Sequence, residues 1–316
     1  QKTAYEIPKR DWSSDVCSFR SATGQFGDVT VRTRDTATPD WSSVYAYSRW
    51  RPSVFGSVAR QTRFRTMTLQ DATSGTVSVT QHEVQAGVFL PVSHVRSRWE
   101  AWATLVRTDA RYVFPDRDRT AALVSSRLAL ANDRSQRYGY SISREHGVYV
   151  GATVEAARRA LGSDADGTTG TVDARAYLPG LGRHHVVAMR AGSAISRGDD
   201  LAVQPFRLGN VAASPSVVDF GGDALGLMRG PGPALTGSRV LSGTLEYRLP
   251  IMVIERGHGT WPLLLRTVHA SVFADAGAVG NANTAWQRRI AAGGELAVDA
   301  VAGYGLPFSA TLGAAW

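Results

Sequence analysis

The chain has 316 residues, of which 43% are hydrophobic and 20% charged, with 35 Lys and Arg against 27 Asp and Glu. This composition excludes a disordered chain and a fibrous one. Charged or small polar residues interrupt every apolar run well short of the roughly 18 residues of a membrane-spanning helix, so no such helix is expected. The single cysteine, Cys17, excludes a disulfide framework and a cysteine-based zinc site.

The N-terminal stretch differs in composition from the rest of the chain. Both lysines, Lys2 and Lys9, lie at its start, and from Arg10 onward every strong base is arginine. The segment YEIPKRDWSSDVCS, residues 5–18, resembles a translated sequencing-adapter remnant. We therefore interpret residues 1–19 as non-native or artefactual and leave them out of the fold prediction. A short genuine arm is the alternative.

From residue 51 onward the dominant pattern is alternation of apolar and polar residues with period 2. In one such run Leu241 and Leu245 share a face, while Glu246 and Arg248 occupy the other. The pattern predicts strands at 53–66, 75–91, 95–111, 119–142, 147–160, 169–179, 183–197, 238–250, 263–277, 288–301 and 305–316. Most of them are far longer than the roughly five or six residues of a strand in a soluble sheet.

Strand length and loop pattern favour a membrane barrel. A tilted strand crosses a bilayer in about 9 to 11 residues, and the connections here alternate short with long, as in outer-membrane barrels. A soluble barrel or sandwich also alternates but turns its apolar face inward, and alternation alone does not say which face is inside. The apolar faces consist largely of Ala, Val, Leu and Gly, whereas the polar faces carry Glu and Arg in mid-strand. We therefore predict an all-β fold, a transmembrane antiparallel up-and-down β-barrel.

Strand parity predicts about 12 strands. With short turns periplasmic and long loops external, the expected strands leave Trp316 at the external surface, whereas a closed barrel of this type has both ends periplasmic. We therefore expect 11 visible strands and a truncated last one. The alternative is that Trp316 is the true end, because residues 306–316 alternate toward a terminal aromatic residue.

Two motifs and the strand between them carry a resemblance to a known family. The long Gly/Pro-rich segment 198–237 contains Met228, Arg229 and Gly230, and a later strand carries Phe273, Asp275 and Gly277. With GTLEYRLP at 243–250 between them, residues 51–316 resemble the surface-antigen superfamily of BamA, TamA and the two-partner-secretion transporters. The resemblance implies that the sixth external loop folds into the lumen and that Arg229 contacts Asp275. Pro231 stands where the family has an aromatic residue.

The charge pair also has a physical basis of its own. An arginine on a glycine-flanked loop reaches far into a lumen, and its guanidinium makes paired hydrogen bonds to a carboxylate that lysine does not copy. Asp275 falls on the polar face of its strand, so we expect substitution of either partner to have similar effects. The alternative is a solvated loop arginine and an aspartate that only forms a turn. We expect further lumen charge partners at Glu246, Arg248, Glu295 and Asp299.

The resemblance also implies a location, a function and partners. It implies an outer-membrane barrel of a Gram-negative bacterium that inserts or assembles outer-membrane proteins, or translocates polypeptide across the outer membrane. Residues 20–50 would be a linker from a missing periplasmic domain, and 51–316 the barrel domain. The implied partners are outer-membrane lipid and lipopolysaccharide, client or cargo polypeptides, and a fused upstream periplasmic domain. The alternative is a passive porin, or a membrane anchor for a fused periplasmic domain.

The sequence shows no pattern of enzyme chemistry. Nucleophile-elbow, Walker, dinucleotide-binding and zincin motifs are absent. His184 and His185 are adjacent on a predicted strand and point to opposite faces, so they do not chelate a metal together. Ser271 with His269 lacks the spacing of a hydrolase site. We expect no catalytic residue, metal or cofactor, and no nucleic-acid partner, because the arginines alternate along strands rather than forming a basic stripe.

Overall fold

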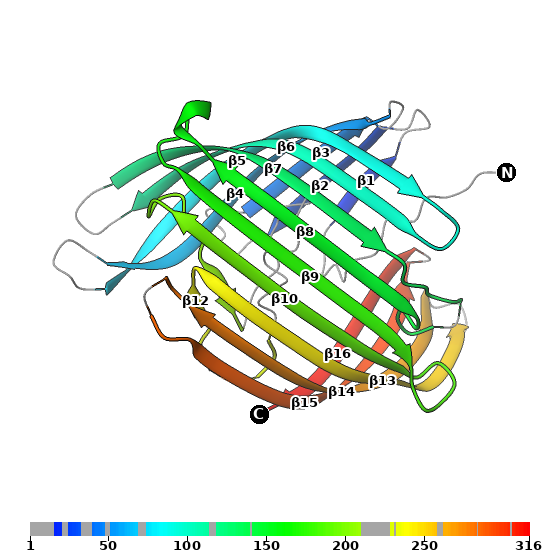
Figure 1. The fold of residues 1–316 in the computed structure, drawn as a ribbon. Coiled ribbons are helices and arrows are strands. Elements are labelled where there is room, and N and C mark those ends of the chain that lie inside the picture. Colours follow the sequence, from blue (N-terminus) through cyan, green and yellow to red (C-terminus); the bar gives the residue numbers. More distant parts are fainter. Residues whose placement is uncertain are drawn as a thin grey trace.

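The computed structural model describes residues 16–20, 25–32, 40–47, 51–68, 74–113, 118–139, 141–209, 228–230, 232–257, 262–282, 284–303 and 305–316. These residues form one antiparallel sheet of 14 strands whose order follows the chain, and a separate two-stranded hairpin. Figure 1 shows long tilted strands in a sheet that curves around on itself. One helical turn, η1 (Arg159–Leu161), is present in the described residues. None of their helices is long and apolar enough to cross a membrane.

All strands expected from the alternation are present, and each pairs with its chain neighbour, so the predicted all-β antiparallel fold is confirmed. They are β4 (Ser53–Thr68), β5 (Ser74–Ser93), β6 (Arg98–Val113), β7 (Asp118–Asp133), β8 (Gly147–Ala157), β9 (Gly167–Pro179), β10 (Val186–Gly198), β13 (Arg239–Gly257), β14 (Leu263–Gly280), β15 (Gln287–Ala302) and β16 (Leu306–Ala315).

Three further strands precede them: β1 (Val16–Arg20), β2 (Gln25–Arg32) and β3 (Asp40–Tyr47). They extend the sheet beyond β4, with Trp41 opposite Arg60 and Tyr47 opposite Val54. The strands β1 to β3 are shorter than most of the others, and the sequence analysis does not predict them. The interpretation of residues 1–19 as non-native and of 20–50 as a linker stays a prediction. Residues 1–15 lie outside the described residues.

The apolar face of the strands points away from the enclosed side of the sheet. Leu105 and Leu128 are 60% and 62% exposed on the outer face. The opposite face buries polar side chains in the middle of strands: Gln85, Thr104, Ser125, Thr153, Asp173 and Asp275. A soluble barrel would bury its leucines and expose its charges, so this arrangement is that of a barrel surrounded by an apolar medium.

Most strand boundaries lie within three residues of the prediction, and two strand ends differ by more, each for a local reason. The strand expected at 119–142 ends at Asp133, whose carboxylate accepts a hydrogen bond from the Ser135 backbone N–H at 2.9 Å and so starts the turn. The strand expected at 238–250 continues to Gly257. Because Pro250 has no N–H to donate, the pairing of β13 with β14 shifts register directly after it, and the strand continues past this bulge.

The long segment between β10 and β13 contains the hairpin of β11 (Phe206–Leu208) and β12 (Leu235–Gly237). In Figure 1 this hairpin is set apart from the strands of the wall. Its side chains pack against the inner face of β10, β13, β14 and β15, in a cluster that buries Ala194, Phe206, Leu208, Met228, Val240, Val279 and Ala291. The described parts of this segment therefore lie on the enclosed side of the sheet, as the resemblance implies.

Candidate functional site: the loop tip and its charge cluster

The tip of the long segment lies against β14, where Arg229 binds Asp275. The Arg229 backbone N–H and its Nε both donate to Asp275 Oδ2, at 3.0 and 3.1 Å, and Nη2 donates to Oδ1 at 3.1 Å. The Asp275 side chain is 2% exposed and that of Arg229 is 30% exposed. Both carboxylate oxygens of the buried Asp275 thus accept hydrogen bonds from Arg229. Because one of these bonds comes from the backbone N–H, the contact fixes the backbone of the loop tip as well as the arginine side chain.

The other two residues of the strand motif shape the same contact. The ring of Phe273 lies under the Arg229 guanidinium, with 3.5 Å between Cζ and the ring centroid, in cation–π geometry. A Cβ at Gly277 would stand 2.6 Å from Leu208 Cδ1, so only glycine there lets the β11 side chain pack against β14. Phe273, Asp275 and Gly277 therefore each contact the inserted segment, from successive inward-facing positions on β14.

Two more carboxylates approach Arg229 from the neighbouring strands. Glu295 of β15 accepts a hydrogen bond from Nη1 at 3.4 Å, and Glu246 Oε2 of β13 lies 3.6 Å from the same nitrogen. Arg248 forms two hydrogen bonds with Glu246, at 3.0 and 3.1 Å. The cluster therefore holds three acids and two arginines, and Arg229 is its only member contributed by the loop.

Met228 and Gly230 flank the arginine and hold the tip in a second way. Met228 is buried in the apolar cluster with Leu208, on the enclosed side of the sheet. Gly230 has a φ of +126°, and a Cβ there would stand 2.8 Å from Ala291 Cβ, so the turn at the tip requires glycine. Pro231, where the sequence departs from the family pattern, lies outside the described residues, as do residues 210–227.

Asp299, the last predicted lumen charge partner, is not part of this cluster. It accepts a hydrogen bond from Thr267 at 2.9 Å and another from Ser309, and it lies 3.6 Å from His269 Nδ1. Of the four charged residues expected in the lumen, Glu246, Arg248 and Glu295 lie in the Arg229 cluster, and Asp299 lies apart from it. Asp299 shares the inward face of β15 with Glu295 but sits four residues further along, about 13 Å at the rise of a strand.

A second luminal charge cluster lies on β9 and β10, and the sequence analysis does not predict it. Asp173 accepts from Arg190 Nε at 3.0 Å and from Arg175 Nη2 at 2.6 Å, and its side chain is buried. The alternation of Asp173 and Arg175 within strand 169–179 was a usable signal for this cluster. Arg190 was not predictable as the partner, because the strand register sets it opposite Arg175 and diagonal to Asp173.

The two adjacent histidines after β9 contact different elements. His184 Nδ1 lies 2.7 Å from Glu145 Oε1, and His185 Nδ1 lies 2.8 Å from the Tyr247 hydroxyl. Burial raises the pKa of Glu145, but hydrogen bonds from Ser141 and His184 and the charge of His184 outweigh it and hold this pKa below its ordinary value of 4.5. The His184–Glu145 contact joins the β9–β10 and β7–β8 connections, at the end of the barrel opposite the inserted segment.

Among the described residues, no group of three or more His, Cys, Asp or Glu is arranged to hold a metal.

Comparison with solved structures identifies the fold. The crystal structure of BamA from Haemophilus ducreyi lacking POTRA domains 1–3 matches with a TM-score of 0.56 and 13% identity, over 93% of this chain and 65% of that one. The chain has the BamA barrel fold. CdiB from Acinetobacter baumannii matches with a TM-score of 0.49 and 9% identity, over 95% of this chain and 58% of that one.

No protein-family model and no curated protein sequence matches the chain. It spans about 65% of the length of the BamA structure that it matches. The BamA fold accounts for the curved antiparallel wall, but at 13% identity it says nothing of the function. The loop-tip site is therefore the feature that bears on function.

Proposed function

We propose that this chain is an outer-membrane barrel of a Gram-negative bacterium that inserts or assembles outer-membrane proteins, or translocates polypeptide, and that it is not an enzyme. The outer face exposes many large apolar side chains, among them Leu105, Leu128 and Ile290, and this supports the membrane location, because an apolar surface of that extent is typical of one that lipid covers. The expected partners are outer-membrane lipid and lipopolysaccharide, client or cargo polypeptides, and a fused periplasmic domain.

The observation that carries the proposal is the inserted loop tip, held by three hydrogen bonds from Arg229 to Asp275. Taking a carboxylate out of water is unfavourable by several kcal/mol unless an ion pair offsets it. A simple pore needs no such buried acid, and an inserted segment obstructs its lumen. A barrel that handles polypeptide has a use for a fixed luminal element, since it holds the late strands β13, β14 and β15 in register.

Reconstituted vesicles test the function directly. The purified chain is inserted into lipid vesicles, and the folding rate of a chemically denatured outer-membrane protein into them is measured by its heat-modifiable migration. We expect the chain to accelerate folding and Arg229→Ala to remove about nine-tenths of the acceleration, a loss of about 1.4 kcal/mol. Arg190→Ala is the matched control, because it removes a luminal, ion-paired arginine that does not touch the loop.

The passive-pore alternative predicts the opposite pattern. It gives a steady single-channel conductance that Arg229→Ala leaves unchanged, with no acceleration of client folding by the wild type. Equal losses in Arg229→Ala and Arg190→Ala would also argue against the proposal, because the loop tip would then have no special role.

A further inference from the structure

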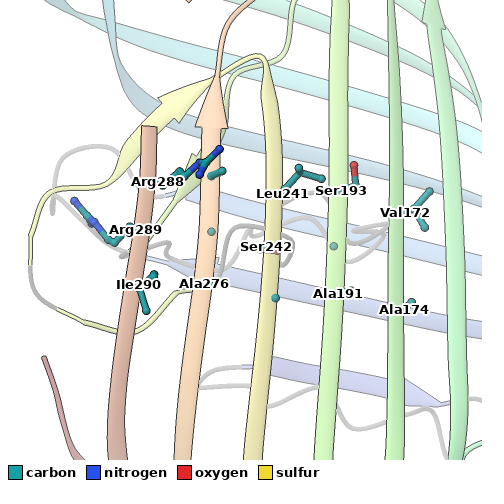
Figure 2. Close-up of a pocket in the computed structure, with 14 residues that line it drawn as sticks. Val172, Ala174, Ala191, Ser193, Leu241, Ser242, Ala276, Arg288, Arg289 and Ile290 are labelled. Atoms are coloured by element: carbon teal, nitrogen blue, oxygen red, sulfur yellow. The ribbon is translucent and has the colours of Figure 1, made fainter. Parts of the chain in front are cut away.

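The outer face carries an apolar groove of about 520 Å³ that crosses β9, β10, β13, β14 and β15. Its floor is one row of small residues that the strand register sets side by side: Ala174, Ala191, Gly243 and Ala276. Figure 2 labels Ala174, Ala191 and Ala276 of this row, each on a different strand. At about 4.8 Å between neighbouring strands, the groove extends roughly 19 Å across the sheet.

Larger side chains form the walls of this groove. The next row toward the long loops holds Val172 and Leu241, which line the groove together with the smaller Ser193 and Ala278 of the same row. Ile290 of β15 stands opposite Ala276 and closes one end. The groove is therefore about one side chain deep and is bounded by the row of Val172 and Leu241 and, at one end, by Ile290.

A cationic side chain stands at the closed end of the groove. Arg288 lines it, is exposed, and sits opposite Ala278 on the outer face of β15. Figure 2 shows its guanidinium over the end of β14, whereas Arg289 turns away from it. Arg289 instead reaches toward the inserted segment, with its guanidinium 3.2 Å from the position of a Cβ on Gly232. Within the described part of the chain, no carboxylate pairs with Arg288.

The position of the groove along the strands fits the headgroup level of a membrane. Arg288 is the second residue of β15, and β15 starts at the end of the barrel that bears the long segment between β10 and β13. The groove extends from this arginine toward the apolar middle of the wall. An arginine at the boundary above an apolar channel complements a ligand with an anionic head and a hydrocarbon tail.

We propose that this groove binds an acyl chain of a phosphate-bearing lipid of the outer leaflet, with the lipid phosphate on Arg288. The inference rests on the membrane location proposed above. The groove presents almost no polar surface, so a polypeptide in it would leave backbone N–H and C=O groups unpaired, whereas an acyl chain has none. The lipid chemistry that meets both features is a phosphorylated, acylated glycolipid such as lipid A.

Native mass spectrometry of the folded barrel, released from nanodiscs that contain lipid A, tests the site. Ala276→Leu fills the floor, and Ala274→Leu adds the same side chain two residues away on the same outer face of β14, outside the groove. We expect the bound lipid A to fall at least threefold in Ala276→Leu and to stay unchanged in Ala274→Leu. Equal retention in the two variants would overturn the proposal.

A second measurement tests the contact between the lipid phosphate and Arg288. Arg288→Gln should lower retention of lipid A at least threefold and abolish the preference for lipid A over its dephosphorylated form, with Arg183→Gln, at an exposed turn of the opposite end, as the control. No preference for the phosphorylated form in the wild type would refute the role of Arg288. These measurements of lipid retention do not use client folding, so they remain valid if the proposed assembly function is wrong. A chain that fails to enter nanodiscs refutes the membrane location itself.

Discussion

Replacement of Arg229 by alanine should release the loop tip from the barrel wall while leaving the hairpin β11–β12 in place. The change removes two side-chain hydrogen bonds to Asp275 and the cation–π contact with Phe273, but keeps the backbone N–H bond. Removing one partner of a buried ion pair destabilises by about 3 to 5 kcal/mol, and the partial exposure of Arg229 places this pair at the lower end. We therefore expect about 3 kcal/mol.

The charge balance makes the two partners unequal, although the sequence alone suggests equal effects. Without Arg229, Asp275, Glu246 and Glu295 face each other with only Arg248 to offset them. Without the Asp275 charge, in Asp275→Asn, the guanidinium keeps Glu295 and Glu246. We therefore expect about 1 to 2 kcal/mol for the aspartate substitution, at the scale of one hydrogen bond to a charged group.

Hydrogen exchange measures both effects at the tip. A loss of about 3 kcal/mol should raise the exchange rate of the Arg229 and Gly230 amides about a hundredfold. The amide of Leu208 should change far less, because the apolar cluster still holds the hairpin. Asp275→Asn should raise the exchange rate at the tip about tenfold.

The double variant completes the cycle. Because Arg229 and Asp275 touch, their effects should fall short of additivity by at least about 1 kcal/mol, the scale of coupling between residues in contact. Additive effects, or an exchange pattern equal to that of Arg190→Ala, would refute the assignment of the tip contact and with it the main support for the proposed function.

Three further predictions concern packing, pH and location. Gly293→Ala should lower the free energy of unfolding by about 1 to 3 kcal/mol, because its Cβ would clash with the backbone oxygen of Ala314 and stand 2.6 Å from Phe273 Cζ. Gly294→Ala, whose Cβ would stand 3.5 Å from its nearest neighbour, should be neutral in the same thermal melts. The depressed pKa of Glu145 means that its contact stabilises the connection above pH 4.5 and is lost as the pH falls further, so exchange there should rise below that pH in the wild type and not in Glu145→Gln. The protein should fractionate with outer membranes and migrate in a heat-modifiable way, and recovery as a detergent-free soluble monomer would contradict the barrel location.

The sequence by itself determined the strands and their order. Alternation with period 2 over long runs is a local signal, since successive side chains of an extended chain point to opposite faces whatever surrounds them. It was sufficient to predict the strands from β4 to β16 that form the wall, and it placed Asp275 and Phe273 on one face of β14. It erred where side chains act on the backbone locally, as at Asp133 and Pro250.

Only the tertiary structure decided which face is enclosed and which charges meet. The same alternation fits a soluble barrel with its leucines inside, and the exposure of Leu105 and Leu128 settles the direction. Register between strands brings Glu246 and Glu295 to Arg229 and leaves Asp299 with Thr267. These contacts join residues far apart in the chain, and they depend on how the strands pair and on where the inserted segment packs. Local periodicity fixes the face of each residue but not its neighbours on the adjacent strands.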